Sequence, residues 1–348
     1  MKTSNPLRKE SVQFKHWPQA LAARLKQLIC KFAHKNPKHF AVFDADNTIW
    51  KYCLDEALLV YLEFKGVLSK RAAVAPLELI PFKKDESLYS YHCRLCEIDR
   101  NIGYLWIDQM FSGLSLRDLK GYVDELYAYE KPIPVSYYQA DILRRDCFSP
   151  PSIYPAQREL IHLLMDNGID VYVISTESEE LVRMVASDPK YGIGIPPENV
   201  IGLNLLLRDP ETGDITTARL QIKRGHFFDE EYSEVYHYSH VLTPYPFGPV
   251  PFYVGKIAAI KGYIHPFRKP ILAAGDSPND YFMFFYCDVE HGGLRLWINH
   301  QDRYLTKTKE MVEQRRDEEK ALGMKATAHK GWLFVRAEEL EAAIICDS

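Results

Sequence analysis

The chain has 348 residues, a hydrophobic fraction of 47%, a charged fraction of 26% and a net charge of −4 at pH 7. These values are ordinary for a soluble globular protein, and the small net charge gives no reason to expect nucleic acid as a partner. No stretch reaches about 18 consecutive apolar residues, so we expect no integral membrane segment. The first residues lack the apolar centre of a secretory signal. We therefore expect a cytoplasmic location, with secretion by another route left open.

Residues 1–37 contain an amphipathic helix, whose apolar face is formed by Leu21, Leu25, Leu28, Ile29 and Phe32. Lysines accompany this face, and a basic amphipathic helix can lie on a membrane. More often such a helix docks on its own domain, which is the interpretation we favour.

A short apolar strand, HFAVF, follows at residues 39–43. From 52 to 149 the pattern is mostly helical, with the clearest helices at 55–68 and 115–130. Within this block Cys93 and Cys96 form a lone CxxC beside His92, and seven scattered cysteines make a disulfide framework improbable. We interpret the CxxC as helix packing, because a zinc site normally needs a second pair.

After residue 150, short apolar strands alternate with helices, a pattern typical of a parallel sheet covered on both faces. The sequence thus predicts an α/β fold with a Rossmann-like, doubly wound parallel sheet. Its core would comprise residues 38–51 and 150–348, and the helical block 52–149 would be an inserted cap. Residues 224–252, rich in His, Tyr and Pro, are predicted to form a long loop. A charge-rich helix is predicted at 303–323, with both signs mixed on a solvated face.

Polar residues stand at the predicted ends of strands and starts of helices. They are Asp44, Asp46, Ser175, Thr176, Lys256, Asp276 and Asp280. In an open parallel sheet, ligands bind outside the carboxyl ends of the strands, so these groups would converge. Crowded carboxylates need a cation, and their hard oxygen atoms suit Mg²⁺.

This inventory suits phosphoryl transfer. Asp44 would attack phosphorus, and Asp46 would protonate the departing oxygen and later activate water. Lys256 and Ser175 would hold phosphate oxygens. A turn could explain Asp44 or Asp46 alone, but it does not explain the other strand-end groups.

DADNT, the strand-end Ser175, Lys256 and GDSPND occur in the order of the four motifs of the haloacid dehalogenase-like hydrolase superfamily, which the chain resembles over about residues 39–300. The resemblance implies that Asp44 is the nucleophile and Asp46 the acid/base. It implies metal binding by Asp44, Asp46, Asp276 and Asp280. It implies phosphate contacts from Thr48, Ser175, Thr176, Lys256 and Asn279, with Lys261 as a weaker alternative to Lys256.

Asp46 implies a phosphatase or phosphomutase, and the helical cap resembles that of the phosphoserine-phosphatase-like and phosphorylcholine-phosphatase-like branch. The expected substrate is a small phosphomonoester, such as phosphocholine or a phosphoserine-like metabolite. Cys53 stands where phosphoserine phosphatases place a substrate-reading carboxylate, with Asp55 and Glu56 close by but offset.

Aromatic residues are frequent on the cap side, at Trp50, Tyr52, Tyr89, Tyr91, Tyr104 and Trp106. An aromatic box with a carboxylate would bind a quaternary ammonium group by cation–π attraction, although aromatic residues at helical spacing usually belong to a core. We expect Trp50 to face the substrate pocket. A phosphoprotein phosphatase with the 224–252 loop as docking surface, and a catalytically idle phospho-ligand-binding protein, are the alternatives.

Overall fold

The structure, a computed structural model, describes residues 12–68, 77–224 and 239–341. A mostly parallel sheet forms its centre, with the strand order β12-β11-β10-β1-β6-β7-β8 and with β9 also paired to β7. The strands are β1 (Phe40–Phe43), β6 (Asp170–Ser178), β7 (Val200–Arg208), β8 (Ile215–Thr216), β9 (Val241–Phe247), β10 (Leu272–Gly275), β11 (Leu294–Asn299) and β12 (Trp332–Arg336).

The centre of this sheet brings three strand ends together. β1 pairs in parallel with β6 on one side and with β10 on the other. Only β8 and β9 run antiparallel within the described sheet, both against β7. The carboxyl ends of β1, β6 and β10 therefore meet at one edge, as expected for a ligand site in such a fold.

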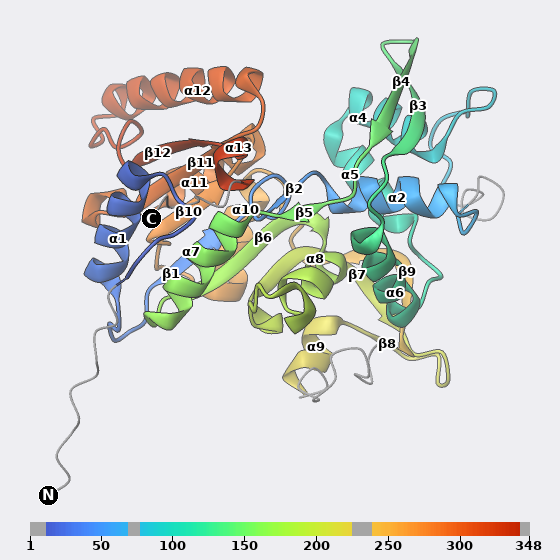
Figure 1. Ribbon diagram of the computed structural model, residues 1–348, viewed down its shortest axis with the longest axis horizontal. Coiled ribbons are helices and arrows are strands. Elements are labelled where there is room, and N and C mark those ends of the chain that lie inside the picture. Colours follow the sequence, from blue (N-terminus) through green and yellow to red (C-terminus); the bar gives the residue numbers. More distant parts are fainter. Residues whose placement is uncertain (1–11, 69–76, 225–238, 342–348) are drawn as a thin grey trace, which may run out of the picture.

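Helices cover both faces of the sheet (Figure 1). Side chains alternate along β1, so that Ala41 and Phe43 join one buried cluster while Phe40 and Val42 join another. The first face packs against α1 (Gln19–Phe32), α7 (Pro155–Asp166), α8 (Glu179–Ala186), α9 (Ala218–Lys223) and α13 (Ala337–Glu341). The second packs against α10 (Val254–Ala259), α11 (Tyr281–Tyr286) and α12 (Asp302–Ala321). The predicted doubly wound α/β fold is confirmed.

The helix α1 buries Leu25, Leu28, Ile29 and Phe32 in the same cluster as Ala41. Its apolar stripe is therefore covered by the protein's own core. Residues 1–11 of the predicted N-terminal segment lie outside the described residues.

A second part of the molecule lies between β2 (Trp50–Lys51) and β5 (Ser152–Ile153), which pair with each other in antiparallel fashion. It contains α2 (Leu54–Phe64), α4 (Leu88–Ile98), α5 (Arg100–Gln109) and α6 (Leu116–Ala128). Ser87 and Ser115 cap α4 and α6 by accepting hydrogen bonds from backbone N–H groups three residues on. We propose the division of the sequence into a cap of residues 52–149 and a core of residues 38–51 and 150–348.

The cap is not entirely helical, which corrects the sequence-based expectation. A hairpin of β3 (Ile133–Gln139) and β4 (Ile142–Phe148) projects from it (Figure 1). Its turn residues, Ala140 and Asp141, both have positive φ. Such turns usually contain Asn-Gly or Asp-Gly, and this one lacks a glycine, so the turn signal was absent.

The prediction of a long loop at 224–252 is also wrong in part. Residues 225–238 lie outside the described residues, but Val241–Phe247 form β9 on β7. Pro244 and Pro246 argued against a strand in the sequence, because proline is tolerated in sheets mainly at edges.

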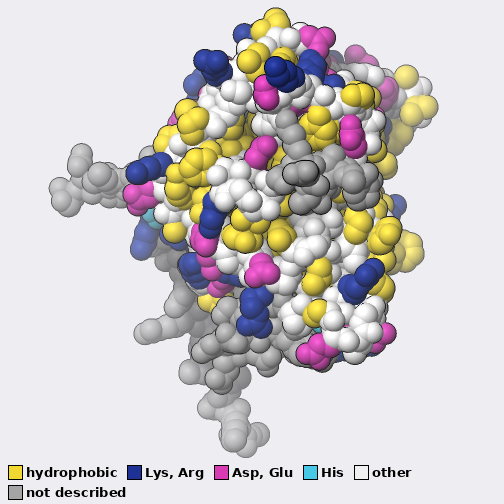
Figure 2. Space-filling model, turned by 90° about the vertical axis from the view of Figure 1, so that its right-hand side faces the viewer, with side chains coloured by type: hydrophobic (Ala, Val, Ile, Leu, Met, Phe, Trp, Pro, Cys, Tyr) yellow, Lys and Arg dark blue, Asp and Glu magenta, His cyan; other side chains and the backbone are white. Residues whose placement is uncertain are grey.

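The exterior carries charges of both signs. Figure 2 views the molecule from the cap side and shows Lys and Arg side chains interspersed with Asp and Glu. On α12, Arg316 pairs with Glu313 and Lys320 with Asp317, consistent with the solvated face predicted for this helix. Among the described helices, none combines the length and apolar character needed to cross a membrane.

Candidate active site

Asp44 and Asp46 follow β1 directly and face different sides of one cavity. The Asp44 N–H donates to Ala274 O of the neighbouring β10 at 2.9 Å, which continues the sheet ladder by one residue. The chain then turns sharply, with Asn47 at a φ of 52° and the Ile49 N–H donating back to Ala45 O at 2.7 Å. This turn gives the two carboxylates separate surroundings although one residue separates them.

The first of these surroundings is the lysine-paired cluster, formed by Asp44, Asp276 and Asp280 around Lys256. One oxygen atom of each carboxylate lies within 4.8 Å of the others. Lys256 Nζ lies 2.8 Å from Asp44 Oδ1 and 2.6 Å from Asp280 Oδ1, and the lysine is completely buried. The other oxygen of Asp280 accepts from the backbone N–H groups of Asp276 and Ser277 at 3.1 and 3.2 Å.

Two glycines allow this close packing. A Cβ atom at Gly275 would overlap the Asp280 carboxylate, and one at Gly255 would overlap the backbone of Val250. Gly255 thereby permits the tight turn that leads into α10, the helix that carries Lys256 against Asp44. Asn279 also fixes this helix start, because its Oδ1 accepts from the Tyr253 N–H at 2.8 Å.

Burial dominates the electrostatics of the lysine-paired cluster. Burial and then the charge of Asp280 raise the pKa of Asp44, Lys256 opposes them, and the net pKa is about 6. Burial, followed by the charges of Asp280 and Asp44, raises the pKa of Asp276 well above its usual range. Burial alone would lower the pKa of Lys256, but Asp280 and Asp44 outweigh it, so the pKa is raised and the lysine is protonated.

Asp46 belongs to the cap-side cluster, which it forms with Asp55 and Glu177. One carboxylate oxygen of each residue again lies within 4.8 Å of the others. Trp50 Nε1 donates to Asp46 Oδ1 at 2.8 Å, as does the Leu54 N–H at 3.2 Å. The Asp55 N–H donates to Glu177 Oε1 at 2.7 Å. Among the described residues, no Lys or Arg forms an ion pair with these carboxyl groups.

Without such a cation, burial and mutual repulsion raise all three pKa values. Burial and the charges of Asp55 and Asp44 raise the pKa of Asp46 well above its usual range. Burial and the Glu56 charge raise the pKa of Asp55 to about 7, and burial and Asp46 raise that of Glu177 strongly. The raised pKa values favour the protonated forms of the cap-side carboxyl groups, as a general acid requires.

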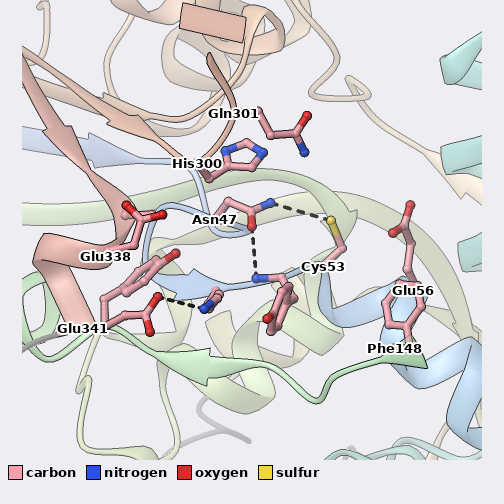
Figure 3. A pocket seen from close by; sticks show the side chains of 12 residues that line it. Asn47, Cys53, Glu56, Phe148, His300, Gln301, Glu338 and Glu341 are labelled. Carbon is pink, nitrogen blue, oxygen red and sulfur yellow. Dashed lines mark hydrogen bonds and ion pairs between the residues drawn. The ribbon is translucent and has the colours of Figure 1, made fainter. Parts of the chain in front are cut away.

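Core and cap together enclose a cavity of about 440 Å³ that reaches both clusters. The core side includes Asp44, Asp46, Asn47, Thr176, Asp276, Ser277, Asn279, His300, Gln301, Arg303 and Tyr304, and the cap side Cys53, Asp55, Glu56, Tyr89, Cys96, Arg100, Tyr104 and Tyr137. A second pocket of about 330 Å³ adjoins it and shares Asn47, Cys53, Glu56, His300 and Gln301 (Figure 3).

Of the other predicted phosphate contacts, Thr176 and Asn279 line the cavity, whereas Thr48 and Ser175 are buried beneath it. Thr48 Oγ1 has no hydrogen-bond partner among the described residues. Ser175 Oγ accepts from the Glu177 N–H at 3.2 Å. The alternative Lys261 is exposed and lies over the Tyr286 ring, so it takes no part in the site.

The predicted metal ligands fall into different groups. Asp44 and Asp276 both line the cavity and belong to the lysine-paired cluster. Asp280 is fully buried behind them, and both its oxygens already accept hydrogen bonds. Asp46, predicted as a fourth ligand, has its carboxylate in the cap-side cluster. The buried carboxylate oxygens around Asp44 and Asp276 fit a hard divalent cation.

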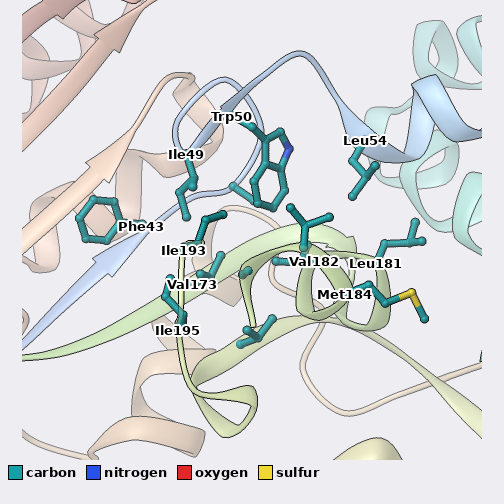
Figure 4. Packing of buried hydrophobic residues seen from close by; sticks show 14 of the residues in the cluster. Phe43, Ile49, Trp50, Leu54, Val173, Leu181, Val182, Met184, Ile193 and Ile195 are labelled. Atoms are coloured by element: carbon teal, nitrogen blue, oxygen red, sulfur yellow. The ribbon is translucent and has the colours of Figure 1, made fainter. Parts of the chain in front are cut away.

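The expectation that Trp50 faces the pocket is wrong. Its indole is completely buried among Ile49, Leu54 and Val182 (Figure 4), and its N–H is used by Asp46. The sharp turn after Asp44 sends Trp50 into the core, since a large apolar ring gains most by burial there. Trp50 thus orients the Asp46 carboxylate and does not line the described cavities.

The other aromatic residues divide between packing and lining. Tyr91 and Trp106 are buried in the cap, whereas Tyr89 and Tyr104 line the cavity. In the lone CxxC, Cys96 lines the cavity with its Sγ 3.5 Å from His92 Nε2, and Cys93 is only partly buried.

Glu177, Arg100 and His300 were not among the residues predicted from the sequence. Glu177 lies two residues after Ser175 on the same strand, and that position was the available signal. His300 follows β11, a strand that was not predicted, and its Nδ1 lies 3.2 Å from Asp276 Oδ2. Burial and then the charge of Arg303 lower the pKa of His300 to about 4.

Comparison with known proteins places these observations in a family. No protein-family model matches the chain. The sequence is 45% identical over 336 residues to the phosphorylcholine phosphatase of Pseudomonas aeruginosa, covering 95% of this chain and 94% of that protein. Among solved structures, a functionally unknown protein from Anaerococcus prevotii shares the fold, with a TM-score of 0.60 and 18% identity over 88% of this chain and 92% of the other.

A haloacid dehalogenase (HAD) family hydrolase from Salmonella enterica also aligns, with a TM-score of 0.40 and 11% identity over 80% of this chain and 72% of the other. The family assignment depends on the curated relative, because its identity extends over nearly the whole of both chains. The chain belongs to the phosphorylcholine phosphatase family, within the haloacid dehalogenase-like superfamily that its four ordered motifs resemble.

Proposed function

We propose that this protein is a phosphatase that hydrolyses a small phosphomonoester, with phosphocholine as substrate, through an aspartyl-phosphate intermediate. The supporting observation is that Asp44 and Asp46, two residues apart, line one cavity but belong to different carboxylate clusters. A lysine offsets the negative charge of the first cluster, whereas protonation offsets that of the second. Asp44 contacts a buried ammonium group, whereas Asp46 lies among carboxyl groups that retain protons. A nucleophile and a general acid require these two different conditions.

In the proposed first step, Asp44 attacks the phosphorus atom. Lys256 binds Oδ1, so Oδ2 forms the new P–O bond while the bond from phosphorus to the ester oxygen breaks. Asp46 gives its proton to the departing oxygen, and the alcohol leaves. Lys256 offsets negative charge on the phosphoryl oxygens, and Thr176 and Asn279 line the cavity where these oxygens would lie.

In the second step, water attacks the phosphorus atom of the acyl phosphate. Asp46, now ionised, takes a proton from that water, the bond between phosphorus and Asp44 breaks, and inorganic phosphate is released. Both carboxyl groups return to their starting states, so atoms and protons balance over the cycle.

We propose Mg²⁺ as the cation, held by Asp44 and Asp276 with Asp280 in support. When bound, it supplies positive charge that stabilises the transferring phosphoryl group. The support is the donor set of hard carboxylate oxygens around Asp44. The cytoplasmic location stays a prediction from the sequence.

The leaving-group side of the cavity supports a quaternary ammonium substrate. Glu56, Tyr89 and Tyr104 all line it from the cap. A carboxylate beside aromatic rings attracts such a cation through charge and through the ring quadrupoles. His92 Nε2 lies 3.4 Å from Glu56 Oε1 and Nδ1 lies 3.1 Å from Gly103 O, so this buried imidazole restrains the carboxylate from behind.

A panel of phosphomonoesters, measured with and without Mg²⁺, tests the proposal. We expect cation-dependent turnover with the highest kcat/KM for phosphocholine, and no measurable turnover by Asp44→Asn. Glu56→Gln should lower kcat/KM for phosphocholine by about tenfold while changing that for p-nitrophenyl phosphate little, since one interaction of this kind contributes about 1–2 kcal/mol.

Three outcomes would contradict parts of this proposal. Turnover by Asp44→Asn would exclude the covalent route. Binding of phosphocholine without turnover of any ester would identify the idle binder instead. Turnover of phosphopeptides but not of small esters would identify the phosphoprotein phosphatase.

A further inference from the structure

Two arginines meet where cap and core approach each other at the cavity. Arg100 is the first residue of α5 in the cap, and Arg303 is the second residue of α12 in the core. Both are exposed at the surface and both line the cavity. They are the only Lys or Arg side chains among its described lining residues.

Tyr304 joins the two guanidinium groups. Arg100 Nη2 donates to Tyr304 Oη at 3.0 Å, and Arg303 Nη2 donates to the same oxygen at 3.3 Å. Arg303 also lies 4.7 Å from the centre of the Tyr304 ring, and its Nε donates to Gln301 Oε1 at 2.6 Å. Within the described ranges, neither guanidinium has a carboxylate within ion-pair distance, so both positive charges are available to a ligand.

The rest of the described cavity lining is rich in carboxyl groups and contains no further Lys or Arg side chain. Its walls carry the carboxyl groups of Asp44, Asp46, Asp55, Glu56 and Asp276. Those that are ionised, as Asp44 must be to attack phosphorus, repel an approaching phosphate dianion, and low-dielectric surroundings strengthen the repulsion. An entry that favours such a substrate therefore needs positive charge outside the acidic walls.

We infer that Arg100 and Arg303, held near each other by their hydrogen bonds to Tyr304, form a binding site for a phosphate dianion at the mouth of the cavity. The site receives the phosphoryl group of the substrate before it reaches Asp44, and it receives inorganic phosphate as it leaves. Guanidinium groups suit this task because their N–H groups match the oxygens of a phosphate. This inference rests on the proposed function and deepens it, since it explains how an acidic cavity admits an anionic ester.

A purely mechanical role is the alternative reading of the same contacts. The bond from Arg100 to Tyr304 also links cap to core, so its loss could alter the enclosure of the cavity. Tyr304→Phe removes this bond and keeps both charges, whereas Arg100→Gln and Arg303→Gln remove one charge each. Arg100→Lys restores the charge without the planar guanidinium.

The test measures kcat and kcat/KM for phosphocholine at low and high salt, with inhibition constants for inorganic phosphate and for choline. We expect Arg100→Gln and Arg303→Gln to lower kcat/KM at low salt by about tenfold each, with kcat nearly unchanged and the salt dependence reduced. Inhibition by phosphate should weaken by a similar factor, whereas inhibition by choline should not. Arg100→Lys should recover part of the loss.

Lys307→Gln is the matched control, because Lys307 is exposed on the same helix one turn beyond Arg303 and does not line the cavity. It should leave every constant unchanged. Tyr304→Phe should retain most of the phosphate inhibition. The inference is overturned if both glutamine variants keep wild-type kcat/KM and phosphate inhibition, or if Tyr304→Phe reproduces their loss. An inactive wild-type protein would instead overturn the proposed function.

Discussion

The lysine-paired cluster and the cap-side cluster contain the same kind of side chain in similar number, yet their charge is compensated in different ways. In the first, a buried ammonium group lies within 2.8 Å of both Asp44 and Asp280. In the second, the described residues supply no ion-paired cation, and protons must offset the crowding of Asp46, Asp55 and Glu177. Asp44 and Asp46, two residues apart on one loop, thus differ in chemistry because each lies in a different cluster.

The acid/base assignment therefore follows from the surroundings of each carboxylate and not from its type. Pairs of titratable groups whose environments separate their pKa values identify the acid and the base in many enzymes. Lys256 favours the ionised form of Asp44, as attack on phosphorus requires. Burial beside Asp55 and Glu177 favours the protonated form of Asp46, as departure of an alkoxide requires.

Removing the proposed acid of the cap-side cluster should reduce activity strongly. Asp46→Asn should lower kcat for phosphocholine by about 10²–10⁴-fold, because choline is a poor leaving group without a proton. p-Nitrophenolate leaves without protonation, so this variant should still release a rapid burst of nitrophenolate in stopped-flow measurements, followed by slow hydrolysis of the intermediate.

Asp44→Asn serves as the control and should show no burst. If Asp46→Asn slowed the first step equally for phosphocholine and for p-nitrophenyl phosphate, the role of Asp46 as general acid would be contradicted.

A smaller effect, on stability, should follow from breaking the lysine-paired cluster. Lys256→Met leaves Asp44 and Asp280 buried without their cation, which should lower the free energy of unfolding by about 3–5 kcal/mol. Urea denaturation measures this loss. Lys261→Met is the matched control, since Lys261 is exposed on the following turn. If the two variants were equally stable, the ion pairs of Lys256 would not hold the cluster together.

The smallest effect should have the opposite sign and come from the cap-side cluster. The pKa of Asp55 rises from 3.8 to about 7 on folding, so its ionisation costs stability as the pH rises through this window. Asp55→Asn should therefore match the wild type at about pH 3.5 and exceed it above about pH 7, by an amount on the order of a few kcal/mol. Thermal denaturation across this range measures the divergence.

Glu179 provides the control of reversed sign. Burial raises its pKa, but Arg183 and Arg219 outweigh burial, and the net pKa lies below 4.5. Its ionised form therefore stabilises the fold above that pH, and Glu179→Gln should be less stable than the wild type at neutral pH. A stability difference for Asp55→Asn that does not grow with pH would contradict its raised pKa.

The sequence predicted the parts of the site that depend on strand ends. Asp44 and Asp276 directly follow β1 and β10, and Ser175 lies on β6 two residues beyond its last pairing with β1, so parallel pairing brings the three together. Lys256 was predictable from its place at a helix start behind Gly255. The partition of the carboxylates into two clusters was not predictable, since it depends on the turn that returns to Ala45 O.

Other parts of the site depend on contacts between distant segments. The direction of Trp50 follows from packing against Val182 rather than from its distance to Asp44 in sequence. β11 was not predicted, and His300 and Arg303 after it were therefore missed. The meeting of Arg100 with Tyr304 joins residues 204 positions apart, which no local pattern encodes.

The pairing of β2 with β5 holds the two ends of the cap together where they join the core. Trp50 lies opposite Ile153 and Lys51 opposite Ser152, so the chain returns beside the point from which it departed. The residues between β2 and β5 therefore form a loop of the core chain, and the two-stranded pairing closes that loop. The entropy of closing a loop grows only with the logarithm of its length. A cap of different length would therefore change the loop-closure entropy that the core must meet only slightly.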